Sequence, residues 1–516
     1  MIPDANTAAA VELRNVSKRF GSVQANEGVN LRITAGSIHG IIGENGAGKS
    51  TAMNLLYGLH RPDSGEIFVN GRRRIWSSPS EAIAAGIGMV HQHFLLAGPH
   101  TALDNIILGA EPSRWGFLKR REGRARLETL ASQYGLAVAL DRPVEELPVG
   151  VQQRVEILKL LYRQANILIL DEPTAVLTPQ ETDELFRNLR KLRDEGKTIL
   201  LITHKLREVL KFSERVTVMG GGKVTGELRT ADTNAQELAD LMVGRKVNFG
   251  LNVAMSPSSA AVVMETHGLG LGTRSGSRPK LSDVNFAVGA VEIVGVAGVE
   301  GNGQFELIQA LLHPGDPRCR TTGAVNILGQ DVSGWPARRI RQLGVAFIPE
   351  DRHHEGLLLH RPLLENFALG QQDPSFCRGG FLQWNKLATA ANEAFAAFDV
   401  RPADLATSAR QLSGGNQQKL VVAREFYRRP KLLIAAQPTR GVDVGAIEFI
   451  HQQLLQARDS GAGVLLVSSD LDEILKLSDR ILVMFEGRMV GEFSRGKVTE
   501  SELGQRMAGI RKHSTA

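Results

Sequence analysis

The fold of this chain is decided by residues 43–51, which read Gly43-Glu44-Asn45-Gly46-Ala47-Gly48-Lys49-Ser50-Thr51. An apolar segment over 37–42 precedes this stretch, and a segment of helical character over 52–59 follows it. Glycines let backbone N–H groups turn inward toward an anion, and the start of a helix attracts negative charge. The stretch therefore predicts a phosphate-binding loop between a strand and a helix. Lys49 is expected to reach the β- and γ-phosphates of a nucleotide, and Ser50 to bind Mg²⁺.

The same plan occurs a second time in the chain. Residues 298–305 read Gly298-Val299-Glu300-Gly301-Asn302-Gly303-Gln304-Phe305, so the glycines remain while the lysine and the hydroxyl group are replaced. The two loops start 255 residues apart (298 − 43), whereas Asp171 and Ala436 are 265 apart (436 − 171). The change of offset indicates an insertion of about ten residues between motifs of the second half.

Strand and helix patterns repeat together with the loops. In the first half an apolar strand ends in carboxylates at Asp171-Glu172, and a segment with an apolar face at Leu185, Leu189 and Leu192 follows it. Continuous apolar strands that alternate with such helices predict a parallel sheet covered by helices. We therefore expect two tandem α/β nucleotide-binding domains, at 9–246 and 262–510, joined by a short linker at 247–261.

Bulk composition places the chain among ordinary globular proteins. It has 516 residues, of which 42% are hydrophobic and 22% charged, and a net charge of +6. The two cysteines, Cys319 and Cys377, match no metal or redox spacing, which favours a reducing, cytoplasmic setting. No secretion signal and no apolar run of about 20 residues is apparent. We read the basic clusters at 72–74 and 119–121 as solvated faces, with contact to nucleic acid or anionic lipid as the alternative.

Polar residues that follow apolar strands complete a candidate catalytic set in the first half. Asp171 is expected to hold Mg²⁺, and Glu172 to polarise the attacking water. The alternative, that this pair only caps the following helix, conflicts with its place between the strand and Pro173. Gln92 lies where an amide could contact metal and water, and His204 follows a strand and could reach the γ-phosphate. His91 and His93 lack the further ligands of a tetrahedral zinc site.

The ordered motifs GENGAGKST, HQH, LPVGVQQR, ILILDEPT and ITHK, together with LSGGNQQK at 412–419, resemble the ATP-binding cassette (ABC) family over essentially the whole chain. The resemblance implies tandem P-loop NTPase domains, each with a mainly parallel core sheet, a helical subdomain and a small antiparallel β subdomain. It also implies that each ATP lies between the phosphate loop of one cassette and the signature sequence of the other. Phe20 would stack on the adenine.

The resemblance separates a complete site from a degenerate one. The complete site would combine the first-half residues with the second-half signature, Ser413, Gly414, Gly415 and Asn416. In the other site, Ala436 and Gln437 replace the carboxylates, Ser469 replaces His204, and Glu350 replaces Gln92. Thr178 also replaces an aspartate that the family usually has, while Asp443 keeps it. We therefore expect one hydrolytic site, with ATP and Mg²⁺, and one structural or weakly binding site.

Within that family, the motifs resemble the fused double cassettes of bacterial simple-sugar and nucleoside importers, with the nucleoside branch favoured. This resemblance implies a peripheral ATPase on the cytoplasmic face of the membrane. Its expected partners are two permease subunits and an extracytoplasmic substrate-binding lipoprotein. The segments at 94–109 and 351–370 are expected to dock the permease. A sugar importer, or a soluble double cassette that acts on ribosomes or DNA, remains as an alternative.

Overall fold

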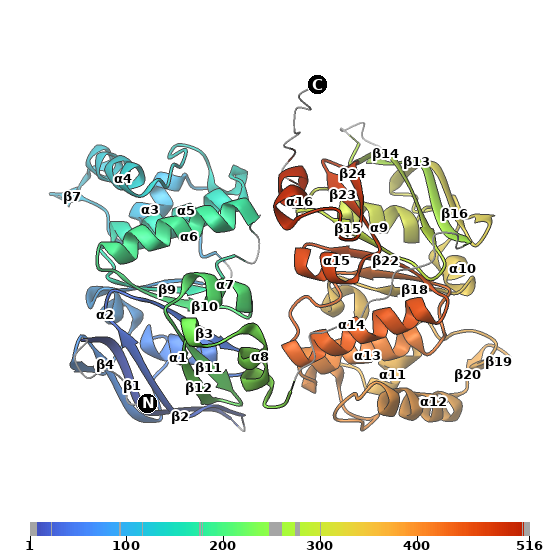
Figure 1. Cartoon of the computed structure of the whole chain (residues 1–516), viewed down its shortest axis with the longest axis horizontal. Helices are drawn as coiled ribbons and strands as arrows, with labels where there is room; N and C mark the ends of the chain where they lie inside the picture. Colours follow the sequence, from blue (N-terminus) through green and yellow to red (C-terminus); the bar gives the residue numbers. More distant parts are fainter. Residues whose placement is uncertain are drawn as a thin grey trace. The chain divides into compact units, whose positions relative to one another are not determined.

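A computed structural model describes residues 8–21, 23–91, 94–115, 117–174, 177, 179–246, 261–273, 279–299, 301–507 and 509. The chain divides into two compact units, 1–247 and 248–516. Each unit contains a mainly parallel six-stranded sheet, an antiparallel four-stranded sheet and a group of helices (Figure 1). The expected linker at 247–261 lies, apart from Ala261, outside the described residues.

The first unit is built from twelve strands and eight α-helices within its described residues. Its strands are β1 (Ala9–Phe20), β2 (Val23–Thr34), β3 (Ile38–Gly43), β4 (Ser64–Val69), β5 (Arg72–Arg74), β6 (Ile87–Val90), β7 (Ser113–Arg114), β8 (Phe117–Leu118), β9 (Ile167–Asp171), β10 (Thr198–Ile202), β11 (Arg215–Gly220) and β12 (Lys223–Arg229). Its helices are α1 (Lys49–Leu56), α2 (Pro79–Ala84), α3 (Ala102–Ile107), α4 (Arg120–Tyr134), α5 (Val149–Tyr162), α6 (Pro179–Asp194), α7 (Leu206–Phe212) and α8 (Ala235–Val243), with short 3₁₀ turns η1 (Val144–Glu146) and η2 (Thr230–Asp232).

The central sheet of the first unit has the strand order β12-β11-β3-β10-β9-β6. All neighbouring pairs are parallel except β11 and β12. Because β3, β10 and β9 are neighbouring parallel strands, their carboxyl ends lie at the same edge of the sheet. Ligands of open α/β sheets bind at such an edge. The second sheet, β2-β1-β4-β5, is antiparallel, and α3–α6 lie on the opposite side of the core (Figure 1).

The second unit repeats this architecture within its described residues. Its strands are β13 (Val262–Thr273), β14 (Leu281–Gly289), β15 (Ile293–Ala297), β16 (Cys319–Ile327), β17 (Gln330–Asp331), β18 (Val345–Ile348), β19 (Cys377–Arg378), β20 (Phe381–Leu382), β21 (Leu432–Ala436), β22 (Gly463–Ser468), β23 (Arg480–Phe485) and β24 (Arg488–Ser494). Its helices are α9 (Gln304–Leu312), α10 (Ala337–Gln342), α11 (Leu363–Ala368), α12 (Trp384–Ala397), α13 (Gly414–Phe426), α14 (Val444–Asp459), α15 (Leu471–Leu477) and α16 (Glu500–Met507), with η3 (Arg352–Gly356) and η4 (Ala409–Gln411).

Strand orders confirm the duplication that the sequence predicts. The second central sheet reads β18-β21-β22-β15-β23-β24, which is the first order in reverse listing, and the second antiparallel sheet reads β14-β13-β16-β17. The predicted fold class of two P-loop-type domains, each with a helical and an antiparallel β subdomain, is therefore confirmed. Among the described residues, no helix is long and apolar enough to cross a membrane.

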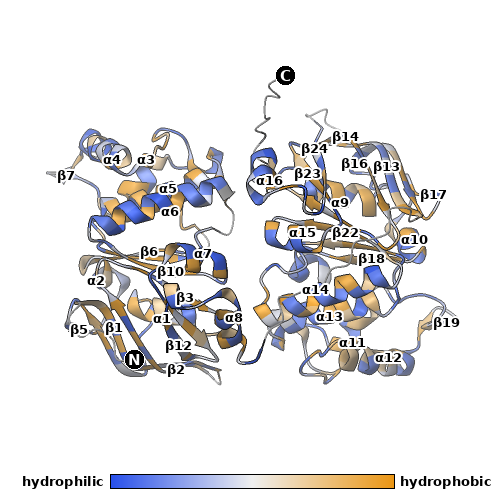
Figure 2. Cartoon of the chain, in the orientation of Figure 1, coloured by the Kyte–Doolittle hydropathy of each residue, from blue (hydrophilic) through white to orange (hydrophobic). Residues whose placement is uncertain are grey.

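Amphipathic helices bury the faces that their periodicity predicts. In α6, Leu185, Leu189 and Leu192 are buried, and the helix carries hydrophobic and hydrophilic residues on different sides (Figure 2). Ile450 and Leu454 of α14 are likewise fully buried. Burying one leucine side chain contributes about 1.5–3 kcal/mol, so these faces hold the helices on the sheets.

A buried histidine lies in the strand that leads to the phosphate loop. His39 of β3 is 1% exposed, and its Nε2 hydrogen-bonds the Oγ1 of Thr217 on β11 at 2.8 Å. Burial, with a smaller contribution from the charge of Arg215, lowers the pKa of His39 to about 3. The folded state therefore favours the neutral imidazole ring. Between pH 6.5 and about 3, protonation of His39 favours the unfolded state.

This histidine predicts an acid sensitivity of the first central sheet. The stabilising contribution of neutral His39 is fully present above pH 6.5 and is lost as the pH falls. Between pH 7 and pH 5 we expect the wild type to lose about 2 kcal/mol relative to His39→Gln. Hydrogen exchange of the β3 amides in the full chain measures this difference. A difference that does not change with pH would contradict the assignment.

Candidate functional site

The loop over residues 43–51 lies between β3 and α1, as the sequence predicts. Gly46 and Gly48 have φ angles of 83° and 93°, which lie in the left-handed region. A Cβ atom on Gly48 would come within 2.4 Å of the carbonyl oxygen of Ala25. Asn26, which is fully buried, donates from Nδ2 to the carbonyl oxygen of Gly48 at 3.1 Å. Both conformation and space therefore require glycine here.

Lys49 opens α1 and points back over its own loop. Its Nζ donates to the carbonyl oxygens of Gly43 at 2.8 Å and Glu44 at 2.9 Å, and the residue is only 6% exposed. Burial lowers the pKa of the ammonium group, while the charges of Glu172 and Asp171 oppose that change. The loop thus holds a desolvated cation beside its backbone N–H groups.

Ser50 and Asp171 bring two oxygen ligands together. Ser50 Oγ donates to Asp171 Oδ2 at 3.2 Å, across a sequence separation of 121 residues. Asp171 ends β9 and is 8% exposed. Burial raises the pKa of its carboxyl group, and the hydrogen bond from Ser50 opposes this. A hydroxyl and a buried carboxylate in contact are the oxygen donors that a hard divalent cation prefers.

Glu172 and His204 form the second polar contact of this edge. The Nδ1 of His204 lies 2.8 Å from Oε1 of Glu172, whose side chain is 14% exposed. Burial on its own raises the pKa of Glu172, but the hydrogen bond from His204 and nearby positive charges outweigh it, so the pKa is lowered. Glu172 is therefore ionised throughout the neutral pH range, as a residue that orients water requires.

The backbone at Glu172 has a strained conformation that the second unit retains. Glu172 has φ 47° and its counterpart Gln437 has φ 44°, although neither is glycine. Their N–H groups donate to Ile202 at 2.9 Å and to Val467 at 2.8 Å, respectively. A left-handed conformation costs a non-glycine residue about 1–2 kcal/mol. The bend after the strand thus belongs to the scaffold, and only the side chain differs.

The second-unit loop keeps the backbone of the first with other side chains. Gly301 and Gly303 have φ 90° and 112°. Gln304 donates from Nε2 to the carbonyl oxygen of Val299 at 2.9 Å, a contact like that of Lys49 with Glu44. Phe305, 55% exposed, stands in place of Ser50. Gln437 accepts hydrogen bonds at 3.2 Å from Ser469 and cannot act as a carboxylate.

The two signature stretches also differ in the structure. Ser413 caps α13, where its Oγ accepts from the N–H of Asn416 at 3.4 Å and from Nδ2 of Asn416 at 3.0 Å. A Cβ atom on Gly415 would lie 2.5 Å from Oδ2 of Asp443, so a larger residue here would displace the Asp443 side chain. In the first unit Pro148 stands at the start of α5 and makes no capping side-chain hydrogen bond.

Four other positions singled out in the sequence have separate outcomes. Gln92, His93 and Thr178 lie outside the described residues. Phe20 ends β1, is 41% exposed, and its ring lies edge-on to His60 at 5.1 Å between centroids. Its predicted stacking on adenine stays a prediction.

The segments after Gln92 and after Glu350 are each fastened by one buried asparagine that the sequence reading missed. Asn105, 3% exposed, accepts from the N–H of Ala97 at 2.7 Å and donates to three carbonyl groups of residues 97–101. Asn366, fully buried, makes the same set of contacts with residues 358–362. The recurrence of Asn in both copies was the only available sequence signal. The backbone of each segment is therefore held by a buried asparagine side chain, while Leu95 and Leu358 remain exposed.

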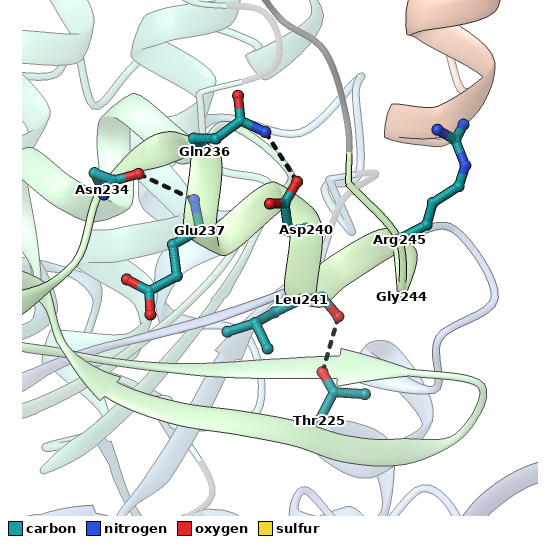
Figure 3. Close-up of a pocket in the computed structure, with 8 residues that line it drawn as sticks. All are labelled: Thr225, Asn234, Gln236, Glu237, Asp240, Leu241, Gly244 and Arg245. Atoms are coloured by element: carbon teal, nitrogen blue, oxygen red, sulfur yellow. Dashed lines mark hydrogen bonds between the residues drawn. The ribbon is translucent and has the colours of Figure 1, made fainter.

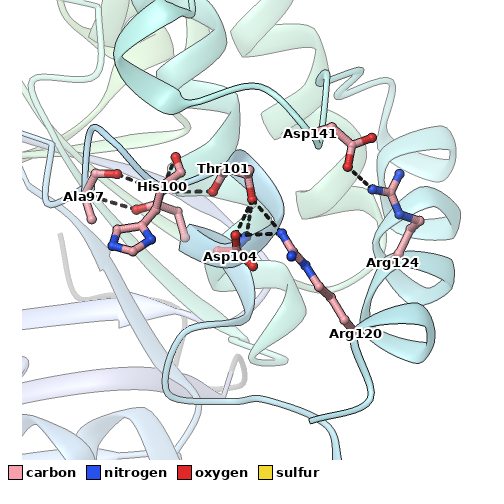
Figure 4. Close-up of polar contacts among 8 residues, drawn as sticks. Ala97, His100, Thr101, Asp104, Arg120, Arg124 and Asp141 are labelled. Carbon is pink, nitrogen blue, oxygen red and sulfur yellow. Dashed lines mark hydrogen bonds and ion pairs between the residues drawn. The ribbon is translucent and has the colours of Figure 1, made fainter.

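The second basic cluster is largely paired with acids. Arg120 bonds Asp104 at 2.7 Å, Lys119 approaches Glu122 at 3.3 Å, and Arg124 pairs with Asp141 (Figure 4). These contacts are exposed and contribute little to stability. They favour the interpretation of this cluster as a solvated face.

A hollow of about 560 Å³ in the first unit lies away from all of these residues. It is lined from β12 and α8, and its polar groups serve local structure (Figure 3). Asn234 caps α8 by accepting from the N–H of Glu237 at 3.0 Å, and Thr225 donates to the carbonyl oxygen of Leu241 at 3.2 Å. It contains none of the predicted nucleotide-binding residues.

Comparison with known proteins finds the family model described as "ABC transporter" over residues 26–175 and again over 281–440. The nucleoside import ATP-binding protein NupA of Lactococcus lactis is 46% identical, over 97% of this chain and 98% of the relative. The guanosine import ATP-binding protein NupO of Bacillus subtilis is 45% identical, over 97% of both. The ribose import ATP-binding protein RbsA of Yersinia pestis is 36% identical, over 98% of both.

Proposed function

The chain belongs to the ABC transporter family, and from this premise we propose that it is the ATP-hydrolysing subunit of a nucleoside importer. The observation that carries the solute class is the identity of 45–46% with relatives named for nucleoside or guanosine import, against 42% with a glucose import relative and 36% with the ribose relative. These identities extend over nearly the whole length of each chain. Each identity is therefore measured over both cassettes.

Hydrolysis is assigned to the first-unit loop. Lys49 and the loop N–H groups bind the β- and γ-phosphates of ATP. Glu172 orients the attacking water, and His204, which contacts Glu172 at 2.8 Å, holds it and faces the γ-phosphate. We assign Gln92 to this set as well, from its place in the sequence. The second-unit signature, Ser413–Asn416, supplies a helix start and a hydroxyl group to the same phosphate.

The oxygen donors of Ser50 and Asp171 fit Mg²⁺. The buried Asp171 carboxylate has no cationic side chain bonded to it in the described residues, and its raised pKa reflects burial that a bound cation would offset. Bound Mg²⁺ neutralises phosphate charge. Gln92 is the third residue that we assign to this ion.

We assign a structural role to the second-unit loop. Gln304 carries no charge, Phe305 offers no hydroxyl ligand, and Ala436 offers no carboxylate. Its glycine conformations nevertheless match those of the first loop. The loop therefore keeps the shape of the domain without the groups that hydrolysis requires.

Transport requires moving parts that the described residues do not contain. We propose two transmembrane permease subunits and an extracytoplasmic substrate-binding lipoprotein as partners, with this chain on the cytoplasmic face of the membrane. The segments fastened by Asn105 and Asn366 are the proposed docking surface, because each combines a fixed backbone with exposed leucines. ATP closing two cassettes would then move what is docked on them.

Solute uptake in a strain that lacks this chain tests the solute class. Restoring the wild-type chain is expected to restore uptake of labelled nucleosides, while ribose, galactose and glucose uptake stays unchanged. Glu172→Gln serves as the matched inactive chain, because it changes one side-chain atom. Restoration of sugar uptake alone would show that the chain serves a sugar importer instead. The relative named for glucose import, 42% identical, belongs to that class of importer. ATP turnover stimulated by ribosomes or DNA would exclude both importers.

A further inference from the structure

A short π-helical turn, η3, follows Glu350 in the second unit. Asp351 fixes the turn, because its side chain accepts from the N–H groups of His353 at 2.9 Å and His354 at 3.0 Å. Its other oxygen hydrogen-bonds Nδ1 of His354 at 2.7 Å. Turns of this kind are rare and concentrate at functional sites. Here the turn directs the side chain of Arg352 back into the domain.

Arg352 connects three separate parts of the second unit. Its Nη1 donates to the carbonyl oxygen of Arg440 at 2.8 Å, and its Nη2 donates to that of Gly441 at 3.1 Å. Its Nε donates to Oε1 of Gln417 at 3.3 Å. These partners lie 88, 89 and 65 residues away in the sequence. The planar guanidinium group therefore bridges consecutive carbonyl groups and a helix at once.

The contact with the signature helix is close and leaves little freedom. A Cβ atom on Gly414, the first residue of α13, would lie 3.0 Å from Nη2 of Arg352. Gln417, one turn further along α13, is 6% exposed and also receives a hydrogen bond from Nε2 of His353 at 2.8 Å. Its own Nε2 donates to Ala409 at 3.2 Å. The first turn of α13 is thus held by the residues of η3.

A second link joins the same parts. Arg440 forms an ion pair with Glu350, the residue directly before the η3 cap. The turn at 440–441 leads into Asp443, which caps α14 by accepting from the N–H of Ala446 at 2.7 Å. Asp443 also lies against Gly415 of α13. Residues 350–352, the 440–443 turn and the start of α13 therefore form one hydrogen-bonded unit, which we call the signature brace.

The position of the first unit that corresponds to Arg352 does not carry an arginine. Glu350 stands in the position of Gln92, so Arg352 corresponds to Phe94, which carries no hydrogen-bond donor in its side chain. The signature of the first unit is also the incomplete one, with Pro148 in place of Ser413. The arginine of the brace therefore belongs to the unit that carries the complete signature.

We infer that Arg352 is a positioning residue for ATP hydrolysis. Arg352 fixes the position of Ser413 and of the start of α13, and that position follows the position of the segment after Glu350. The inference rests on the proposed function, in which that segment contacts a permease subunit. Movement of the docked segment then reaches the signature helix through Arg352. Arg352 acts through Ser413 and Gly414 and does not itself touch the nucleotide.

Two substitutions and one matched control test this role. Arg352→Ala removes all three contacts, while Arg352→Lys keeps the positive charge but cannot bridge two carbonyl groups and Gln417. Arg495→Ala is the control, because Arg495 likewise donates to two backbone carbonyl groups of the second unit, those of Ser478 at 2.8 Å and Leu477 at 2.7 Å, outside both the segment at 351–370 and α13. Thermal unfolding of the full chains shows whether all variants fold.

The first measurement is hydrogen exchange of the amides at 412–418 in the full chain. Both Arg352 variants are expected to exchange faster there than Arg495→Ala. The second is ATP turnover of the chain assembled with its permeases in vesicles, as the ratio of permease-stimulated to unstimulated rates. We expect this ratio to fall at least about tenfold in both Arg352 variants, because misplacing a reacting group by about 1 Å can cost about 10²-fold. Arg495→Ala is expected to keep the wild-type ratio.

The possible failures are distinguishable. If the wild-type complex shows no stimulation by permeases, the proposed function itself fails. If it is stimulated, and the Arg352 variants keep the same ratio as Arg495→Ala, only the role of Arg352 is overturned. Faster exchange at 412–418 with an unchanged ratio also overturns it, because Arg352 would then only stabilise the turn.

Discussion

Replacing Glu172 by glutamine is expected to lower ATP turnover by about 10²–10⁴-fold while ATP still binds. Glutamine keeps the shape of the side chain and can still accept a hydrogen bond from His204, so the geometry of the strand end persists. What disappears is the negative charge that orients and polarises water. Phosphate release and equilibrium binding of ATP, measured on the same preparation, separate the two effects.

Glu208→Gln is the matched control for this experiment. Glu208 is a carboxylate of similar burial, 8% exposed, and it accepts a hydrogen bond from Thr174 at 2.6 Å away from the phosphate loop. We expect its turnover to stay near that of the wild type. Comparable losses in both variants, or loss of ATP binding in Glu172→Gln, would show that Glu172 supports structure and not hydrolysis.

Lys49→Ala is expected to remove both tight ATP binding and turnover, with a loss of at least about 10²-fold in rate. The ammonium group of Lys49 is nearly buried and already lies on the carbonyl groups of Gly43 and Glu44. Alanine removes both of these contacts together with the positive charge that they place on the loop. Nucleotide titration and steady-state turnover measure the two losses.

Gln304→Ala provides the corresponding change in the second unit. Gln304 makes the same kind of backbone contact as Lys49 but carries no charge, so removing it is expected to leave most of the turnover intact. A collapse of turnover to background in Gln304→Ala would overturn the assignment of hydrolysis to the first loop alone. Equal, independent turnover at both loops would do so as well.

Much of the fold could be predicted because its signals are local. The glycines of residues 43–51, the apolar strands and the faces of α6 and α14 each depend on neighbours within a few residues. Their repetition then predicted two domains of one design, which the strand orders confirm. The buried asparagines escaped prediction, because Asn105 and Asn366 lie in segments where asparagine is an ordinary loop or helix residue.

The sequence by itself determined that one phosphate loop has its lysine and hydroxyl group while the other lacks both, since residue identity needs no coordinates. Only the tertiary structure decided which groups, distant in the sequence, lie in contact. The contacts of Ser50 with Asp171, Glu172 with His204 and Arg352 with Gly441 join residues 121, 32 and 89 positions apart. Such pairs depend on the order and register of the parallel strands, and that order arises from the packing of the whole domain.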